Sequence, residues 1–413
     1  MYNSTFTQEQ LDRRFNKVDF QNDINLKTPA YRQQVVQSAV ALAKQGFGAT
    51  NFVLSDLGGK VIYQIKDIAS LLVLRKAALN LTKISKARQR NRLEVVKRLA
   101  LLSQEGMPFT ILKLDIKSFY ESVDRTILRS MTVKRFSTAP STRNVIDHFL
   151  ALCDSQGVTG LPRGMAISAA LSEFYLQDFD AEVVKIHKPF FYARYVDDIV
   201  LLMPSQTEFK VLRKSFCHLL RKIGLRLNNK KSKPIAIDGE KPKIAAIAGE
   251  FDYLGYKFQI SKLIGDKPLA THRAVTLDLA PSKVKKRKTR ITASFLRYLE
   301  DGNFDDLHDR LRILAFNYKY FDFKNGGMLL TGNYHVYRLI DYPSSALKEL
   351  DHYLRGMLLD DKGPICARLR LSLSSALREQ LLKISFDAGF RDKVHFNFDT
   401  DRLVHLVRCW KYV

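Results

Sequence analysis

Acidic residues interrupt two apolar, strand-like segments of the sequence. Asp197 and Asp198 lie within FYARYVDDIVLL (191–202), and Asp115 ends the apolar run FTILKLD (109–115). Adjacent carboxylates in a core-forming segment are unfavourable unless they are paired or bind a cation. Acids at the ends of two neighbouring strands are what two-metal phosphoryl transfer requires, and carboxylate oxygens are ligands that Mg²⁺ prefers. The competing interpretation is that Asp-Asp only forms a hairpin turn, because Asp is a favoured turn residue.

A glycine-rich stretch lies between these acids in the sequence. GLPRG (160–164) predicts a loop whose backbone can approach a ligand closely, because glycine has no Cβ. Small residues follow it and predict a helix with a flat surface beside the acids, suited to a base pair: Ala166, Ser168, Ala169 and Ala170. An equally compatible interpretation of this segment is a loop followed by a tightly packed core helix.

The periodicity of the apolar residues divides the chain in two. From about 105 to 260, short apolar strands (109–115, 191–202 and 251–261) alternate with helices (165–183 and 206–223). This alternation predicts an α+β domain with an antiparallel sheet. After Pro281 the periods are helical, which predicts an all-helical C-terminal part. The domains that we expect are 1–104, 105–265 and 266–413.

The overall composition excludes several classes of protein. The 413 residues are 46% hydrophobic and 11% aromatic, which excludes wholesale disorder. Four scattered cysteines, with no CxxC pair, exclude a disulfide framework and a zinc site of the usual spacing. No apolar run reaches the roughly eighteen residues of a membrane span, and the N-terminus is polar, so we expect a cytoplasmic protein.

Basic residues exceed acidic ones and are clustered. The chain has 67 Lys and Arg against 42 Asp and Glu, a formal net charge of +25. Residues 75–98 hold nine Lys and Arg against one Glu, 283–290 hold six with no acid, and a third group lies within 221–243. A single basic run is usually a solvated helix surface, but three runs in so basic a chain favour binding to phosphates. The nucleic-acid contacts expected in the second run are Lys285, Lys286, Arg287 and Lys288.

Five segments resemble the motifs of reverse transcriptases, in that family's order. They are LDIKSFYESVD (114–124, motif A), GLPRGMAIS (160–168, B), YVDD (195–198, C), GLRLNNKKSK (224–233, D) and YLGYKF (253–258, E, the primer grip). The resemblance covers roughly 85–260. It implies a right-hand polymerase with fingers, a palm that carries the acids, and a helical thumb. The implied enzyme is an RNA-directed DNA polymerase, a nucleotidyltransferase that copies an RNA template into cDNA from dNTPs.

The resemblance also implies roles for individual residues in motifs A and C. Asp115, Asp197 and Asp198, with the backbone carbonyl of Ile116, would bind two Mg²⁺ ions, for which Mn²⁺ is an alternative. Tyr120 occupies the steric-gate position that excludes a ribose 2′-hydroxyl, where viral RNA-dependent RNA polymerases generally carry an acid. This tyrosine, together with YVDD in place of GDD, favours DNA synthesis.

The remaining motifs add contacts to the nucleotide and the primer. Lys231, in the Leu-Asn-x-x-Lys-Ser pattern of motif D, would donate a proton to pyrophosphate; alternatively, it is a solvated lysine in a basic run. Arg92 falls where the fingers place cations on the triphosphate, and Arg163 and Gly164 of motif B complete the expected dNTP site. The expected primer grip consists of Tyr253, Leu254 and Gly255.

Motif B departs from the common pattern, because Arg163 stands where Gln is usual. Gly-Leu-Pro-Arg-Gly together with Asp-Ile-Lys-Ser-Phe-Tyr resembles the bacterial abortive-infection and "unknown group" reverse transcriptases, which include defence-associated enzymes. This resemblance implies antiphage defence in which a structured noncoding RNA is copied, without a membrane partner and with homo-oligomerisation left open. The alternatives are a retron or mobile-intron reverse transcriptase, a template-independent or protein-primed DNA polymerase, and a catalytically dead RNA-binding scaffold.

Overall fold

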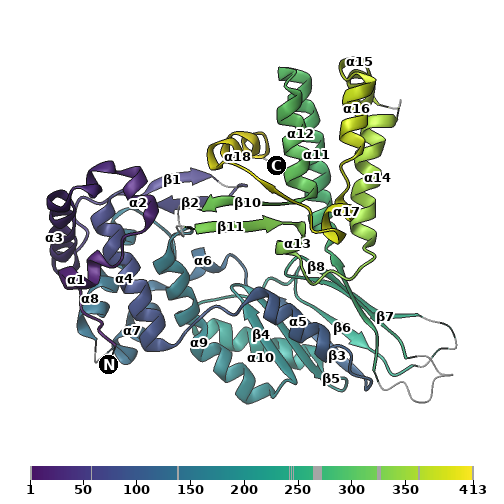
Figure 1. Ribbon diagram of the computed structural model, residues 1–413. Helices are drawn as coiled ribbons and strands as arrows, with labels where there is room; N and C mark the ends of the chain where they lie inside the picture. Colours follow the sequence, from purple (N-terminus) through teal and green to yellow (C-terminus); the bar gives the residue numbers. More distant parts are fainter. Residues whose placement is uncertain are drawn as a thin grey trace. The chain divides into compact units, whose positions relative to one another are not determined.

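The computed structural model describes most of the chain, and its folded residues divide into two compact units (Figure 1). The described residues are 2–56, 58–136, 139–240, 242, 244, 246–263, 272–322, 327–360 and 363–411. The first unit comprises Met1–Val95 and Met107–Asp238, and the second comprises Val96–Gly106 and Gly239–Val413. The boundary expected at 265/266 falls in the stretch 264–271, which lies outside the described residues.

A four-stranded antiparallel sheet forms the centre of the first unit. Its strand order is β4 (Phe191–Tyr195), β5 (Asp198–Pro204), β3 (Phe109–Asp115) and β6 (Lys233–Ile237). The apolar runs that predicted strands are the buried ones: all residues of β3 except Lys113 are buried, as are Ile199–Met203 of β5. Both runs therefore form the interior of the sheet, and each has an aspartate at one end.

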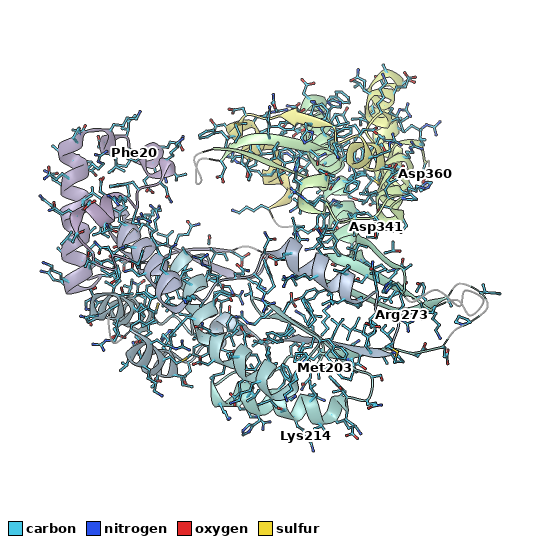
Figure 2. The ribbon with its side chains drawn as sticks, turned by 60° about the horizontal axis from the view of Figure 1, so that its bottom comes forward. Phe20, Met203, Lys214, Arg273, Asp341 and Asp360 are labelled. Carbon is cyan, nitrogen blue, oxygen red and sulfur yellow. The ribbon has the colours of Figure 1, made fainter. Side chains whose placement is uncertain are left out.

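Helices bury the remaining apolar surface of this unit. The long helix α9 (Ala166–His187) packs against α4 (Ile68–Ser85), which also contacts α3 (Pro29–Gln45) and α8 (Pro140–Ser155). The amphipathic helix α10 (Phe209–Lys222) turns Leu212 and Phe216 into the core that also holds Met203 of β5. Figure 2 shows Lys214 on the outward side of α10. The remaining helices here include α1 (Gln8–Asp12), α2 (Lys17–Asn22), α6 (Phe119–Ser122) and α7 (Arg125–Arg135).

A separate hairpin, β1 (Val53–Asp56) and β2 (Val61–Gln64), reaches the glycine-rich loop of the first unit. The backbone N–H of Tyr63 donates to the carbonyl of Arg163 at 2.8 Å. Gly164, at φ +97°, lies so close to β2 that a Cβ would meet the Ile62 side chain at 2.6 Å. Glycine is therefore required where this loop contacts the hairpin.

The second unit begins with a three-stranded antiparallel sheet, β7 (Ile247–Tyr253), β8 (Tyr256–Ser261) and β9 (Val275–Leu279). Buried Arg273 donates to the carbonyls of Glu105 and Gly106 at 3.0 and 3.1 Å, which ties 96–106 to this unit (Figure 2). Helices follow: α11 (Pro281–Asp301), α12 (Phe304–Ala315), α13 (Asn333–Val336), α14 (Ser345–Leu359), α15 (Pro364–Ser372), α16 (Ser375–Leu382), α17 (Phe386–Arg391) and α18 (Thr400–Val407).

The mixed α/β class with antiparallel sheets is confirmed, but the C-terminal part is not wholly helical. It holds a second sheet of order β11 (Gly327–Gly332), β10 (Asn317–Asp322) and β12 (His395–Asn397), visible in Figure 1 beside α13. The helical period of DDLHDRLRILAFNYKYF (305–321) predicts a helix over this whole segment, but α12 ends at Ala315. The segment that follows it alternates aromatic and polar residues, as a strand does, so that Tyr318 and Tyr320 lie on one side with ring centroids 6.3 Å apart.

Candidate active site

The pairing of β3 with β5 brings together the acids that the sequence places far apart. In this antiparallel register Asp115 lies directly opposite Asp198. Tyr195 pairs with Asp198 on the other side, so that Val196 and Asp197 form a two-residue turn between β4 and β5. The turn is held against β3 because the N–H of Ile116 donates to the carbonyl of Asp197 at 3.1 Å. The structure therefore places all three predicted acids, and Ile116, at one end of the sheet.

Val196 at the tip of this turn adopts φ +60°, in the left-handed region. A β-branched residue is strongly disfavoured there, so the surrounding structure must hold it in place. One such contact comes from Arg194, whose Nη1 donates to the carbonyl of Val196 at 3.1 Å. Strain maintained at the acidic turn is typical of a functional site.

Arg194 itself belongs to a buried ionic network beneath the turn. Its guanidinium, 6% exposed, donates to both oxygens of Glu173 at 3.1 and 2.8 Å and to Asp180 at 2.8–3.1 Å. Both acids lie on α9, and the Tyr192 hydroxyl also donates to Asp180. The network thus fixes the strand before the turn to the helix that follows the glycine-rich loop.

Burial and neighbouring acids raise the pKa of Asp197 and of Asp198. Burial, followed by the charges of Asp197 and Asp115, raises the pKa of Asp198 to about 6, against the opposing effect of Lys113 and Lys231. The pKa of Asp197 is raised as well, chiefly by burial and further by Asp115. Neighbouring carboxylates with raised pKa values repel one another when they are ionised. A bound cation would relieve this repulsion, so cation binding there is favourable.

Asp115 is held by two residues from the segment before β6. Asn228 Nδ2 donates to Asp115 Oδ2 at 2.8 Å, and Lys231 Nζ lies 3.3 Å from Oδ1. Asn228 is fixed in turn, because its backbone N–H donates to the Asp115 carbonyl at 2.7 Å and its own carbonyl accepts from Ser232. Lys231 is 67% exposed at its side chain and also forms an ion pair with Asp115.

Both oxygens of the Asp115 carboxylate are thus engaged by donors of the protein itself, Asn228 and Lys231. Within the described part of the chain, no three His, Cys, Asp or Glu side chains converge closely enough to hold a metal ion. The donor set nevertheless fits a hard divalent cation, because three carboxylates and a backbone carbonyl adjoin one another along paired strands. Metal binding would require the Asp115 carboxylate to exchange its contacts with Asn228 and Lys231.

The glycine-rich loop packs directly on the turn that follows Asp115. The N–H of Leu161 donates to the carbonyl of Tyr120 at 2.8 Å, and Gly160, at φ +60°, lies where a Cβ would be 2.1 Å from that carbonyl. The helix after the loop, α9, buries Ser168, Leu171 and Phe174. One face of α9 is thus packed in the core, whereas Ala166 and Ala169 of the small-residue surface are exposed.

Tyr120 is partly buried between the loop and α9. Burial raises the pKa of its phenol, and Ser172 of α9 counters this with a hydrogen bond. The guanidinium of Arg163 lies over the tyrosine ring, 5.0 Å from its centroid, and forms a bidentate pair with Glu121. Glu121, Asn228 and Arg194 are not among the predicted site residues, although Asn228 belongs to the same motif D pattern as Lys231.

The other residues predicted for binding lie elsewhere in the fold. Arg92 begins α5 (Arg92–Leu102), while its neighbour Arg90 donates to the backbone carbonyl of Tyr192 at 2.8 Å. The predicted primer grip belongs to the second unit, where Leu254 and Gly255 form the turn between β7 and β8 with φ of 47° and 83°. Tyr253 before that turn is buried.

The predicted basic run lies on α11, and its four residues differ in their surroundings. Lys285 and Lys286 are exposed. Arg287 is engaged within the unit: it donates to Asn333 Oδ1 at 2.5 Å and lies over the ring of Tyr337. Lys288 pairs with Glu349 at 2.6 Å. Two of the four are thus committed to internal contacts. In the third basic group, residues 241 and 243 lie outside the described residues.

Residues 61–258 match the family model described as "Reverse transcriptase (RNA-dependent DNA polymerase)". This segment is therefore similar to a reverse transcriptase domain. It contains all three acids, the glycine-rich loop, the contacts from Asn228 and Lys231, and the β7–β8 turn. The catalytic class implied by the domain is an RNA-directed DNA polymerase.

Other comparisons add less to this assignment. A structure of apo telomerase from Candida tropicalis, truncated from its C-terminal domain, is similar at 14% identity and a TM-score of 0.36. The match covers 54% of this chain and 57% of the telomerase chain, so the reverse transcriptase domain rests on the family match alone. No curated protein matches the chain in sequence. No helix in the described ranges is long and apolar enough to cross a membrane.

Proposed function

We propose that the protein copies an RNA template into cDNA from dNTPs, by nucleotidyl transfer supported by two divalent metal ions. The observation that carries this proposal is the register of β3 and β5, which sets Asp115 opposite Asp198 and beside Asp197 within the reverse transcriptase domain. These three side chains and the carbonyl of Ile116 would hold Mg²⁺. When bound, the ions supply Lewis-acid activation of the primer hydroxyl and neutralise charge on the leaving pyrophosphate.

The chain's own residues orient the reactants. Arg194 donates to the carbonyl of Val196 and so fixes the backbone of the turn that carries Asp197. Tyr120 supplies a ring surface beside the acids that excludes a 2′-hydroxyl. Lys231 lies close enough to Asp115 to deliver a proton to the pyrophosphate once its ion pair is exchanged. Leu254 and Gly255 form the primer grip.

The template that we propose is a structured noncoding RNA, and the biological role is antiphage defence. Support comes from the motif B sequence Gly-Leu-Pro-Arg-Gly, which resembles defence-associated bacterial enzymes. The net charge of +25 supplies the electrostatic attraction that an RNA partner requires.

The test is dNTP incorporation on a primed RNA template with Mg²⁺ by the wild type and by the double variant Asp197→Asn, Asp198→Asn. Removing the metal-binding charges should lower incorporation by about 1000-fold or more. The matched control is Asp178→Asn, which removes an exposed acid paired with Arg135 in the same unit. It should retain full activity. Incorporation by the double variant within tenfold of wild type would contradict the assignment.

Two further measurements test the template and the role. Sequencing the RNA and DNA that co-purify with the protein from cells should yield one RNA species and DNA complementary to it. The double variant should yield the RNA without the DNA. Phage plating on cells that carry either form should show protection with the wild type only; equal plating would remove the defence role while leaving the polymerase activity in place.

A further inference from the structure

An ion pair joins motifs A and B directly beside the predicted sugar gate. Arg163 Nε donates to Glu121 Oε1 at 2.6 Å, and its Nη2 donates to Oε2 at 2.9 Å. This is the planar, two-bond arrangement in which arginine recognises a carboxylate most strongly. Glu121 follows Tyr120 immediately on α6, and Arg163 lies 42 positions further along the sequence. The ion pair therefore links two distant segments next to the predicted gate residue.

The surroundings of Arg163 allow it little freedom. Its backbone carbonyl accepts from Tyr63 of β2, and Gly164 beside it is packed against Ile62. The side chain is 20% exposed and lies over the Tyr120 ring, with the guanidinium carbon 5.0 Å from the ring centroid. Arg163, within the glycine-rich loop, therefore contacts two other elements. Its backbone contacts the hairpin β1–β2, and its side chain contacts Glu121 of α6.

Tyr120 is bounded on two sides by these contacts. Arg163 covers one face of the ring, and Ser172 of α9, whose hydroxyl donates to the Ala169 carbonyl, lowers the pKa of the phenol. The Arg163 guanidinium that lies over the ring is itself held by Glu121. Arginine in place of the glutamine usual in motif B thus has a matching acid in motif A of the same chain.

We infer that Glu121 and Arg163 are positioning residues that set the choice of sugar by holding the ring of Tyr120. The inference rests on the proposed function, in which Tyr120 is the steric gate. The competing role for Arg163 is direct contact with the triphosphate. Because a phosphate would use the same two donors that Glu121 occupies, the two roles predict opposite effects when Glu121 is neutralised.

The experiment compares kcat/KM for a dNTP and for the matching rNTP on one primed RNA template. Glu121→Gln keeps the size of the side chain but loses the charged, two-bond pair. We expect the preference for dNTP over rNTP to fall about tenfold, mainly through better use of rNTP. A ratio measured on one preparation is unaffected by the fraction of active enzyme, so a purely structural defect would not change it. Asp178→Asn, which breaks another exposed pair of the same unit, should keep the wild-type ratio.

Two more variants test the coupling between the pair and the gate. Arg163→Lys keeps the charge but lacks the planar fork, and should lower the ratio as Glu121→Gln does. Adding Glu121→Gln to Tyr120→Ala should produce no further loss, because the pair acts only through the ring. Exchanging the partners, Glu121→Arg with Arg163→Glu, should restore part of the discrimination.

Other outcomes overturn the inference. If Glu121→Gln lowers KM for dNTP and leaves the sugar ratio unchanged, Arg163 is a ligand of the triphosphate. Additive losses in Tyr120→Ala with Glu121→Gln would show that the pair acts independently of the gate. A wild type that discriminates and a Glu121→Gln variant that discriminates equally would remove the inference and leave the proposed function. A wild type that incorporates no dNTP would remove the proposed function, and the inference with it.

Discussion

Two carboxylates, a buried one in the second unit and a half-buried one in the first, have opposite pKa shifts. Asp306 on α12 is 2% exposed and accepts from Arg310 at 3.0 Å, from His405 at 2.7 Å and from Arg402. Burial raises its pKa, but the hydrogen bonds from His405 and Arg402 outweigh burial, and the pKa lies below its usual value. Asp198, in the segment that matches the reverse transcriptase family, has its pKa raised to about 6 by burial and by its acidic neighbours.

The difference separates Asp306, a structural acid whose neighbours favour its ionised form, from Asp198, whose burial and acidic neighbours oppose ionisation. At Asp306, hydrogen bonds from Arg402 and His405 attach α18 to α12. At the turn of β4 and β5, burial and the acidic neighbours outweigh Lys113 and Lys231, so the pKa of Asp198 stays raised, and the pKa of Asp197 is raised as well. Burial of an acid therefore indicates little by itself; the direction of its pKa shift indicates whether its surroundings favour or oppose the ionised form.

The largest expected effect follows from removing the structural acid. Asp306→Asn should lower the free energy of unfolding of the second unit by about 3 kcal/mol, because buried Arg310 loses its carboxylate partner. Urea denaturation would measure it. Asp309→Asn, which removes an acid that also pairs with Arg402, is the milder control, at about 1 kcal/mol. Equal effects of the two substitutions would contradict the special role of Asp306.

The difference in the free energy of unfolding between wild type and Asp306→Asn should depend on pH. Because folding lowers the pKa of Asp306, the stability it contributes is present above the pKa of the unfolded chain, about 4. It is lost as the pH falls through the lower pKa of the folded state. The stability gap between wild type and Asp306→Asn should hold at neutral pH and narrow below about pH 4.

The second effect concerns the binding of Mg²⁺ to the acids at the end of β3 and β5. Mg²⁺ at ten times its dissociation constant should stabilise the wild type by about 1.4 kcal/mol, since it binds the folded state. The double variant Asp197→Asn, Asp198→Asn should show no such gain, whereas Asp306→Asn should keep it. Thermal melting with Mg²⁺ or with EDTA measures both. A magnesium response that survives in the double variant would place the metal site elsewhere.

The third effect is smaller and opposite in sign to that at Asp306. Without divalent metal, Asp198→Asn should stabilise the protein at pH 8 by about 1 kcal/mol, because it removes a charge that folding makes less favourable. A raised pKa destabilises the folded state increasingly as the pH rises from about 4 through 6. The gain should therefore shrink at pH 5. Destabilisation at pH 8 would show that Asp198 is a structural acid like Asp306.

The acids and their strands could be predicted from the sequence because one apolar run ends in aspartate and the other is interrupted by two. Once β3 and β5 are recognised as strands, an antiparallel register that aligns the two runs brings Asp115 to Asp198. The contacts that hold these acids were not predictable in the same way. Asn228 reaches Asp115 across 113 positions, and the pairing of Arg163 with Glu121 depends on how closely the loop packs on α6. Such contacts depend on tertiary packing, which local periodicity does not encode.

The C-terminal sheet was missed for a different reason. The helical period of α12 leads directly into the six residues of β10, with a single residue between the two elements. A strand of six residues can show at most three alternations of residues that point to opposite faces. The helical period of α12, directly before it, obscures so short a pattern. Its pairing with β12 joins Asn317 to His395, and this pairing is likewise tertiary.

The basic residues of α11 also differ in whether the fold engages their side chains. Lys288 pairs with Glu349 and Arg287 donates to Asn333, whereas Lys285 and Lys286 are exposed. The two exposed lysines are the ones that phosphates can reach. Of the four residues predicted to bind nucleic acid, we therefore expect these two to contribute most.

The smallest expected effect is a change in the salt dependence of RNA binding. Lys285→Ala with Lys286→Ala should reduce the slope of log K against log salt by about 1.4, at about 0.7 per lost phosphate contact on single strands. Affinity should fall about equally for unrelated RNA sequences, since phosphates carry no sequence information.

Lys288→Ala should leave the slope unchanged and lower stability by less than about 1 kcal/mol, because its charge is already matched by Glu349. Titrations of fluorescent RNA over a range of KCl concentrations measure these slopes. If Lys288→Ala changes the slope as much as the double variant does, the ion pair with Glu349 opens on binding, and exposure alone does not identify the lysines that contact RNA.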